Sequence, residues 1–260
     1  MSLTGHLAEL RRRLLISLAF VALGMVLGWL YYEQVFDLLA SPYLDAAERL
    51  AAEKGRPKPQ LTLSTIAGPL VFQLKISFVA GVVMSSPIWL YQLWAFITPG
   101  MMNKERKWAV IFIATAVPLF FVGVGLAYWV LSKAIDVLLG FTPDDVINLN
   151  ELSTYLNFIL RMLLVFGVAF ELPVFILLLN FAGVVSGARL SKWRRGAIFA
   201  IFVFAAVGTP TGDPVTMLLL AIPMWILFEI AVLICRFHDK RKGDLEPDYE
   251  QWSDDEASPI

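Results

Sequence analysis

The sequence predicts an all-α membrane protein with six transmembrane helices, and two observations carry this prediction. Hydrophobic residues make up 58% of the 260 residues and charged residues only 17%, whereas a soluble globular domain is about half apolar and about a quarter charged. The apolar residues are gathered in blocks, most of them near the roughly 20 residues that a helix needs to cross ~30 Å of hydrocarbon. We therefore expect a bundle of helices that face lipid.

The first apolar block follows three consecutive arginines at positions 11–13 and extends from Leu14 to Tyr32. Basic residues before an apolar run also begin a secretory signal peptide. This run is longer than a signal-peptide core, and no small-residue cleavage site follows it. We interpret Leu14–Tyr32 as the first transmembrane helix.

The second, third and fourth predicted transmembrane helices are Leu70–Ile97, Trp108–Leu131 and Tyr155–Phe181. Each is long enough to cross a bilayer, some with length to spare for tilt. The loops that join these helices on the outer side, Glu33–Pro69 and Ser132–Thr154, place apolar residues between charged ones. We expect amphipathic helical pieces that lie on the outer face of the membrane.

The last two predicted transmembrane helices are short. Gly196–Gly208 is too short to cross ~30 Å at 1.5 Å per residue. Val215–Ile234 has an uninterrupted apolar core that ends at Phe228, because Glu229 follows. A polar turn, Thr209–Pro214, lies between the two segments. We expect a short hairpin whose tip lies below the outer surface, or a locally thinned bilayer.

Lysine and arginine residues indicate the orientation of the chain. Outside the predicted helices they cluster at positions 11–13, 104–107, 189–195 and 236–242, all on the side of the N-terminus. Cytoplasmic loops carry the excess of basic residues. We therefore expect an inner-membrane protein with both termini in the cytoplasm.

The chain divides into a predicted six-helix membrane domain, residues 1–237, and a C-terminal tail, residues 238–260. The tail is acidic and poor in hydrophobic residues, so we expect it to be disordered and cytoplasmic.

Several kinds of chemistry are excluded by composition and motif. One cysteine, Cys235, and two histidines, His6 and His238, do not make a zinc or haem site. No phosphate-binding loop, GxSxG or HExxH motif is present. The sequence predicts neither an enzyme nor a cofactor, and the net charge of −1 gives no reason to expect nucleic acid.

Ionisable residues inside predicted transmembrane helices are candidates for function, because a charge in lipid is costly. Glu171 is the clearest, and Pro173 close behind it should bend the helix. The alternative is a protonated carboxyl that is hydrogen-bonded within the bundle. We expect Arg161 and Lys75 to extend toward the outer interface, and Glu229 is equally well interpreted as an interfacial carboxylate.

Two carboxylates on the predicted cytoplasmic side, Glu9 and Glu105, lie among basic residues. Arginines at positions 11–13 follow Glu9, and Glu105 stands between Lys104 and Arg106. From spacing alone the favoured interpretation is ordinary helix pairing, in which Glu9 contacts Arg12 or Arg13 at i+3 or i+4. Such a pair contributes a few tenths of a kcal/mol.

Several segments resemble the TatC family, the multi-span core of the twin-arginine protein-export system. They are His6–Arg13 (HLAELRRR), Ser86–Trp108 (SPIWLYQLWAFITPGMMNKERKW), Phe166–Phe175 (FGVAFELPVF), Thr209-Pro210 and Ala221–Ile230 (AIPMWILFEI). The likeness extends from about residue 3 to residue 237, and the motifs occur in the family's order. The ordered set is far more specific than any single motif.

The resemblance implies a concave, cup-like bundle of six helices that binds twin-arginine signal peptides of folded cargo. It also implies an oligomeric assembly with the single-span partners TatA and TatB, driven by the proton gradient. The family's signal-binding patch falls on Glu9, Arg11, Phe96, Pro99, Met101 and Glu105, its intramembrane carboxylate on Glu171, and its outer and partner-binding positions on Pro42, Asp213 and Met217.

Two positions depart from the family pattern. Met101 stands where leucine is usual, a mild change, and Met217 stands where a glutamine is usual, so the partner hydrogen bond expected there is in doubt.

The chemistry of arginine fits this assignment. A guanidinium offers a planar fork of donors that a carboxylate can bind through two hydrogen bonds, whereas lysine offers a point charge. Two carboxylates can therefore select paired arginines over paired lysines. With the resemblance included, we favour a binding role for Glu9 and Glu105 over simple pairing.

Two other classes of function remain as alternatives. A secondary transporter of a small solute or ion would also use an intramembrane glutamate and a proline-broken helix, but such folds usually contain an internal repeat. The Glu171–Pro173 segment has no counterpart in the first half of the chain. An intramembrane enzyme would need a nucleophile and a base, and no such pair lies within the predicted helices.

Overall fold

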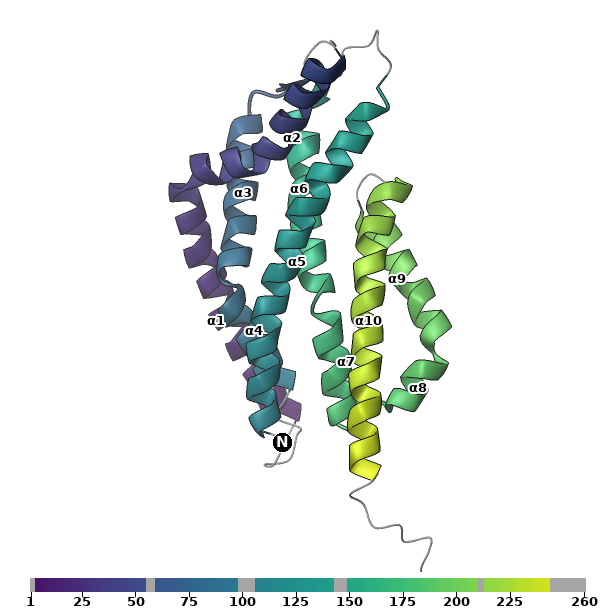
Figure 1. The fold of residues 1–260 in the computed structure, drawn as a ribbon. Coiled ribbons are helices and arrows are strands. Elements are labelled where there is room, and N and C mark those ends of the chain that lie inside the picture. Colours follow the sequence, from purple (N-terminus) through teal and green to yellow (C-terminus); the bar gives the residue numbers. More distant parts are fainter. Residues whose placement is uncertain (1–2, 55–58, 98–105, 143–148, 210–212, 244–260) are drawn as a thin grey trace, which may run out of the picture.

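The computed structural model describes residues 3–54, 59–97, 106–142, 149–209 and 213–243, with side chains placed for most of them. Within these ranges the chain is almost entirely helical (Figure 1). The elements are α1 Leu3–Leu30, α2 Tyr32–Lys54, β1 Gln60–Thr62, α3 Gly68–Met84, α4 Ser86–Ile97, α5 Arg106–Gly140, β2 Leu149–Glu151, α6 Leu152–Ala169, α7 Leu172–Phe181, α8 Gly187–Lys192, α9 Arg194–Gly208 and α10 Pro214–Gly243.

Among the described residues, four segments are long and apolar enough to cross a membrane: Gly5–Leu30, Ala114–Gly140, Leu152–Phe181 and Pro214–Arg241. They include most of the first, third, fourth and sixth predicted helices. A fifth candidate is the pair α3 and α4, which is bent by 58°. α9 has 15 residues, or about 22 Å of helix, so the prediction of a short fifth segment is confirmed.

The second predicted helix, Leu70–Ile97, is not continuous. It breaks at Ser85 into α3 and α4. Pro87 lacks the backbone N–H that would continue the ladder. The carbonyl of Gly81 accepts from the backbone N–H of Ser85 at 3.0 Å and also from the Ser85 hydroxyl at 2.7 Å. Nε1 of Trp89 donates to the carbonyl of Val82 at 2.8 Å. Side chains thus supply hydrogen bonds at the break, although the buried hydroxyl of Ser86 has no partner among the described residues.

The sixth helix is longer than predicted. α10 has 30 residues, so the prediction of a short sixth segment is wrong for the helix itself. Glu229 does not interrupt it, because its carboxylate pairs with Arg194 of α9 and accepts from Nε1 of Trp225 at 3.0 Å. The predicted boundary after residue 237 falls inside α10, and residues 244–260 of the predicted tail lie outside the described part of the chain.

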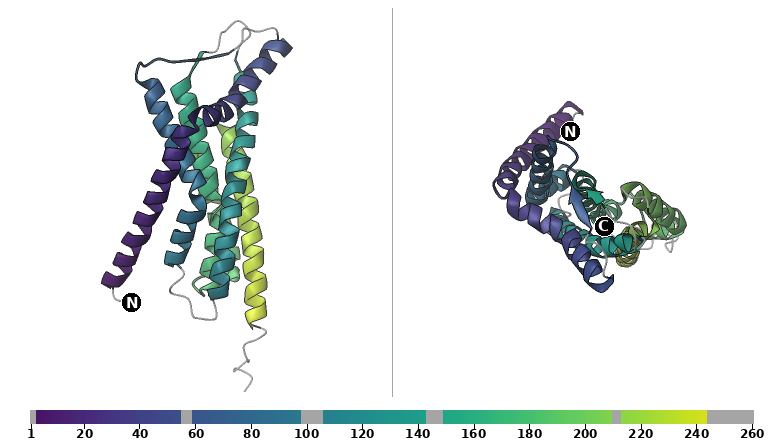
Figure 2. Two further views of the ribbon diagram at one scale, coloured as in Figure 1. Left: turned by 90° about the vertical axis from the view of Figure 1, so that its left-hand side faces the viewer. Right: turned by 90° about the horizontal axis from the view of Figure 1, so that it is seen from above.

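Both described ends of the chain lie at one end of the bundle, and α2 lies across the other end (Figures 1 and 2). We call these the terminal end and the α2 end. The beginning of α1 and the end of α10 are at the terminal end, together with the α4 C-terminus and α8.

α2 forms a helix in the first loop that the sequence predicted to be helical. Pro42 lies inside it, and a proline removes the donor to the carbonyl four residues earlier, which is that of Leu38. The hydroxyl of Tyr128 on α5 donates to this carbonyl at 2.9 Å. The hydroxyl of Tyr155 on α6 donates to the next carbonyl, Leu39, at 2.6 Å. Two tyrosines therefore fasten α2 to the bundle at its proline.

The second outer loop differs from the prediction of a helical piece. α5 continues to Gly140, and Leu149–Glu151 forms β2, which pairs in parallel with β1. Asn150 also donates to the hydroxyl of Tyr43 on α2 at 2.9 Å. A three-residue strand needs a partner, and here the partner lies almost ninety residues earlier in the chain (β1), so local sequence could not predict it.

α1 and α3 approach closely over three glycines. An added Cβ on Gly24 would lie 2.8 Å from the carbonyl oxygen of Gly81, and one on Gly28 would lie 2.9 Å from that of Ser77. Small residues spaced by four bring backbones of membrane helices into contact. These residues fix α1 against α3, and α1 also packs on α4.

Candidate functional site

The first candidate region lies at the terminal end, where the first turns of α1 meet α4. Glu9 and Arg13 form an ion pair one helical turn apart: Nη2 and Nε of Arg13 donate to Oε1 of Glu9 at 2.7 and 3.0 Å. Nη1 of Arg13 donates to Oε1 of Gln92 on α4 at 3.2 Å. Arg13 therefore joins the predicted binding carboxylate to the second helix of the site.

A groove of about 310 Å³ borders this ion pair. Phe96, a predicted site residue, lines it from α4 and stacks on His6 with ring centroids 4.4 Å apart. The residues that line the groove are mostly apolar: Leu10, Arg13, Leu14, Ser17, Trp89, Gln92, Leu93 and Phe96. The structure thus brings Glu9 and Phe96 to one place.

Of the other four predicted members of this patch, the structure describes only Arg11. Arg11 is exposed on α1. Pro99, Met101 and Glu105 lie outside the described residues, so the structure does not test their predicted role.

The second candidate region is a cavity of about 710 Å³ bounded by α4, α6, α7, α9 and α10. Its lining is apolar except at Glu171, the one ionisable side chain among the described residues that line it. Glu171 is 8% exposed. Glu171 thus lies in an otherwise apolar cavity, within the candidate membrane segment Leu152–Phe181.

Glu171 lacks hydrogen bonds where they would be expected. In the described part of the chain, neither of its carboxylate oxygens has a partner, and neither does Nε1 of Trp94. The indole of Trp94 faces the carboxylate, but the two groups do not form a hydrogen bond of ordinary geometry. Unpaired buried polar groups cost free energy, and a ligand that supplies a donor to Glu171 would remove part of this cost.

The backbone around Glu171 explains how the side chain is presented. α6 ends at Ala169 and α7 begins at Leu172. Pro173 has no N–H for the carbonyl of Ala169, and the ladder resumes when Phe175 donates to the carbonyl of Glu171 at 3.0 Å. The helix is thus interrupted next to Pro173, where the sequence predicted a bend.

The groove and the cavity are neighbours. Leu93 lines both, and a third hollow of about 260 Å³ shares Ser17 and Trp89 with the groove and Val168 with the cavity. Three adjoining hollows, lined largely by apolar residues, therefore lie between Arg13 and Glu171.

The predicted outer residues have structural roles. Asp213 precedes α10 and caps it: Oδ1 accepts from the backbone N–H of Thr216 at 2.8 Å, and the Thr216 hydroxyl contacts Oδ2. Pro42 is buried in α2. Met217 is partly buried and packs on the core. Lys75 donates to Asn157 at 2.9 Å, and Arg161 is exposed.

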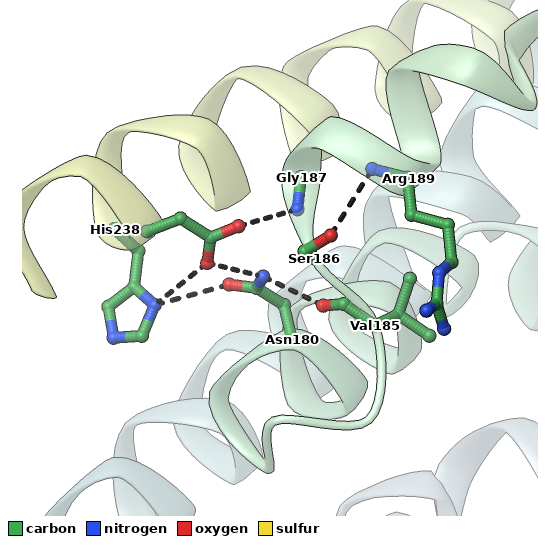
Figure 3. A network of polar contacts seen from close by, with 7 residues as sticks. Asn180, Val185, Ser186, Gly187, Arg189 and His238 are labelled. Carbon is green, nitrogen blue, oxygen red and sulfur yellow. Dashed lines mark hydrogen bonds and ion pairs between the residues drawn. The ribbon is translucent and has the colours of Figure 1, made fainter. Parts of the chain in front are cut away.

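A polar network at the terminal end was not predicted (Figure 3). Nδ2 of Asn180 donates to Oδ1 of Asp239 at 2.8 Å and to the carbonyl of Val185 at 2.9 Å. The other oxygen of Asp239 accepts from the N–H of Gly187 at 2.6 Å. His238 contacts Asn180 at 3.2 Å. The network ties the last turns of α10 to the turn between α7 and α8.

One residue of the sequence, Asn180, is a local signal for this network. Asn180 is a polar residue inside an apolar run, and it is 4% exposed, so it requires a partner. The identity of that partner could not be predicted, because Asp239 lies in the segment assigned to the tail.

Comparison with known proteins gives a consistent result. A family model described as Sec-independent protein translocase protein (TatC) matches residues 5–223. A relative from Frankia casuarinae, named Sec-independent protein translocase protein TatC, is 43% identical over 267 residues, which cover 100% of this chain and 73% of that protein. A protein of the same name from Aquifex aeolicus is 32% identical over 249 residues, which cover 95% and 99% of the two chains.

Solved structures agree with the sequence relatives. A crystal structure of the twin arginine translocase receptor TatC in DDM has a TM-score of 0.78 and 32% identity, and the match covers 88% of this chain and 99% of that one. A second crystal structure of the twin arginine translocase receptor TatC has a TM-score of 0.77 and 32% identity, and the match covers 90% of this chain and 99% of that one. The residues that the family model matches, 5–223, include Glu9 and Glu171.

Proposed function

The chain belongs to the TatC family of Sec-independent protein translocase proteins, and from this premise we propose that it is the receptor that binds twin-arginine signal peptides. The observation that supports the proposal best is the row of three adjoining, largely apolar hollows between Arg13, beside Glu9, and Glu171, which we propose act as one concave binding surface. The family is one of transport subunits, and the proposed role is binding and scaffolding rather than catalysis.

The two ends of this surface suit the two parts of such a peptide. Glu9, together with Glu105, binds the arginine pair through charge-assisted hydrogen bonds. The apolar part of the peptide lies along the groove and the cavity, where burial of apolar surface contributes about 25 cal/mol per Å². Glu171 then offers a polar contact inside an otherwise apolar wall.

The topology belongs to the same proposal. With the bent pair α3 and α4 counted as one crossing and the short α9 as another, the chain crosses the inner membrane six times. An even number agrees with the position of both described ends at one end of the bundle (Figure 1), which we assign to the cytoplasm from the basic clusters. The acidic tail lies on that side.

We further propose that TatA- and TatB-like single-span subunits pack on α9 and α10, around the hairpin that Asp213 caps, in an oligomeric complex. A short α9 leaves the bilayer locally thin, which suits a protein that moves folded cargo. The proton gradient supplies the energy in this proposal, as it does for the family.

The test uses the purified full chain in detergent micelles and two labelled peptides that differ only in an arginine pair or a lysine pair. We expect the arginine peptide to bind more tightly, and Glu9→Gln or Glu105→Gln to weaken it about tenfold or more, since each removes one charged acceptor. Equal binding of the two peptides to the unaltered protein, or full binding in both variants, would contradict the proposal.

A further inference from the structure

We infer that Arg13 competes with the signal peptide for Glu9 and sharpens the selection of arginine over lysine; this inference rests on the proposed function. Glu9 already holds a guanidinium in this structure, because Nε and Nη2 of Arg13 both donate to its Oε1 at 3.0 and 2.7 Å. The group that occupies Glu9 is the same chemical group that the proposed ligand brings.

Arg13 is also held from the other side of the groove. Its Nη1 donates to Gln92 on α4 at 3.2 Å, so one guanidinium makes three hydrogen bonds to two helices. The side chains of Arg13 and Glu9 are 22% and 24% exposed, which leaves the pair open to an incoming group yet partly shielded from solvent. An arginine that approaches Glu9 along the groove has to share or displace this guanidinium.

The competition favours arginine over lysine for a geometric reason. A guanidinium can replace both N–H donors that Arg13 presents to the carboxylate, since it carries the same planar fork. An ammonium is a compact and strongly hydrated charge. To bind Glu9, it has to displace the two N–H donors of Arg13 and also lose its own water of hydration. Arg13 therefore lowers the affinity for both residues, and it lowers the affinity for lysine more.

The experiment measures the binding of the arginine-pair and lysine-pair peptides to the full chain and to Arg13→Gln. Removal of a partly exposed ion pair corresponds to about a two- to fivefold change in affinity. We expect Arg13→Gln to bind the arginine peptide more tightly by that factor and the lysine peptide by a larger factor, so that the discrimination between the peptides decreases.

Arg12→Gln is the matched control. Arg12 is on the same helical turn and is exposed, so the variant removes the same charge without vacating Glu9. We expect it to change the binding of both peptides equally and by less. If Arg12→Gln reproduces the effect of Arg13→Gln, general repulsion accounts for the result and the inference is wrong.

A second variant tests the same inference if Arg13→Gln does not fold. Gln92→Leu removes the bond to α4 but keeps the charge of Arg13, and we expect it to tighten arginine-peptide binding in the same direction by a smaller factor. Unchanged or weaker binding in Arg13→Gln, or in Gln92→Leu if the first variant does not fold, overturns the inference. If the unaltered protein binds the arginine-pair and lysine-pair peptides equally, the proposed function itself is contradicted.

Discussion

At the scale of single residues, the least satisfied group in the described structure is the carboxylate of Glu171. Both its oxygens are buried without a hydrogen-bond partner among the described residues, inside a cavity that is otherwise apolar. Natural proteins keep such groups where function needs them, at a cost in stability. Stability and export should therefore respond in opposite directions when this residue is replaced.

We predict that Glu171→Leu raises the free energy of unfolding by about 1–3 kcal/mol, because an unpaired polar group is replaced by an apolar one of similar size. The same variant should lose export of a twin-arginine substrate in cells. Thermal unfolding in detergent measures the first effect, and Glu171→Gln, which keeps a polar group, serves as the comparison. A lower melting temperature for the leucine variant would show that the carboxyl makes a stabilising contact.

Glu151, at the α2 end and outside the membrane-spanning segments, provides a pH-dependent contribution. Hydrogen bonds from Ser153 and then Ser64 lower the pKa of its carboxyl below the usual 4.5. A lowered pKa means that the folded state favours the ionised form, so the stabilisation is complete above about pH 4.5 and is lost as the pH falls through the lower folded-state value.

We therefore predict that Glu151→Gln makes the melting temperature less sensitive to pH below 4.5. Ser64→Ala should have part of the same effect, because it removes one of the donors. Glu53→Gln, a change of an exposed carboxylate on α2, is the control and should retain the full acid sensitivity. If the two glutamine variants behave alike, these hydrogen bonds contribute nothing measurable.

The candidate site could be predicted from sequence only in part. Glu171 is a candidate because a carboxylate inside an apolar run is conspicuous. For Glu9, spacing alone favours helix pairing, and only the resemblance to the TatC family favours a binding role. Arg13 was recognised as a helix partner of Glu9 but not as a bridge to α4, since Gln92 is distant in sequence. The groove and the cavity were not predictable, because they depend on how α1, α4, α6 and α9 pack together.

At the scale of helices and strands, hydropathy located the membrane segments but not their breaks. Side chains that satisfy or neutralise polar groups within an apolar run accompany the break between α3 and α4 and the full length of α10. Pro87 was a local signal for the first of these breaks. The pairing of Glu229 with Arg194 was not predictable, because it joins two helices across a turn.

The contact of α1 with α3 gives a prediction at this scale. An added Cβ on Gly81 would lie 2.5 Å from the backbone nitrogen of Met25 and 2.8 Å from the carbonyl oxygen of Val21. These are backbone atoms, which cannot move away independently. We predict that Gly81→Ala destabilises the protein by about 1–3 kcal/mol, as overpacking generally does, and lowers the melting temperature in detergent.

Gly125→Ala is the matched control for this substitution. Gly125 is also in the interior of a transmembrane helix, α5, but an added Cβ there would meet nothing within 4 Å. Alanine has the higher helix propensity by up to about 1 kcal/mol, so this variant should be as stable as the unaltered protein or more stable. A similar loss in both variants would mean that backbone flexibility, and not close packing, explains the glycines.

At the scale of the whole molecule, long-range contacts hold the helices together at both ends of the bundle. The network of Asn180, Gly187 and Asp239 fixes the end of α10 at the terminal end (Figure 3), and the two tyrosines fix α2 at the other. Between these fixed ends, α9 packs mainly on α10. The cavity around Glu171 is therefore bounded on one side by a helix that has few other contacts.

This arrangement predicts where the apolar part of a bound signal peptide lies. Phe204 on α9 lines the cavity and is 41% exposed, whereas Phe199 on the same helix is 71% exposed and is not among the lining residues. With the photoreactive p-benzoylphenylalanine at either position, we expect the arginine-pair peptide to cross-link several-fold more at 204 than at 199. Both substitutions keep an aromatic ring, so the comparison depends on position alone.

The lysine-pair peptide separates recognition from simple partition into lipid or micelle. A peptide that reaches α9 only by partition should label both positions to the same extent, whether it carries arginine or lysine, since its apolar segment is unchanged. A peptide that is bound first at Glu9 should lose the cross-link at 204 when its arginines are replaced or when Glu9→Gln is introduced. Persistence of that cross-link in both cases would show that the acidic end and the cavity act independently, and that the concave surface is not one binding path.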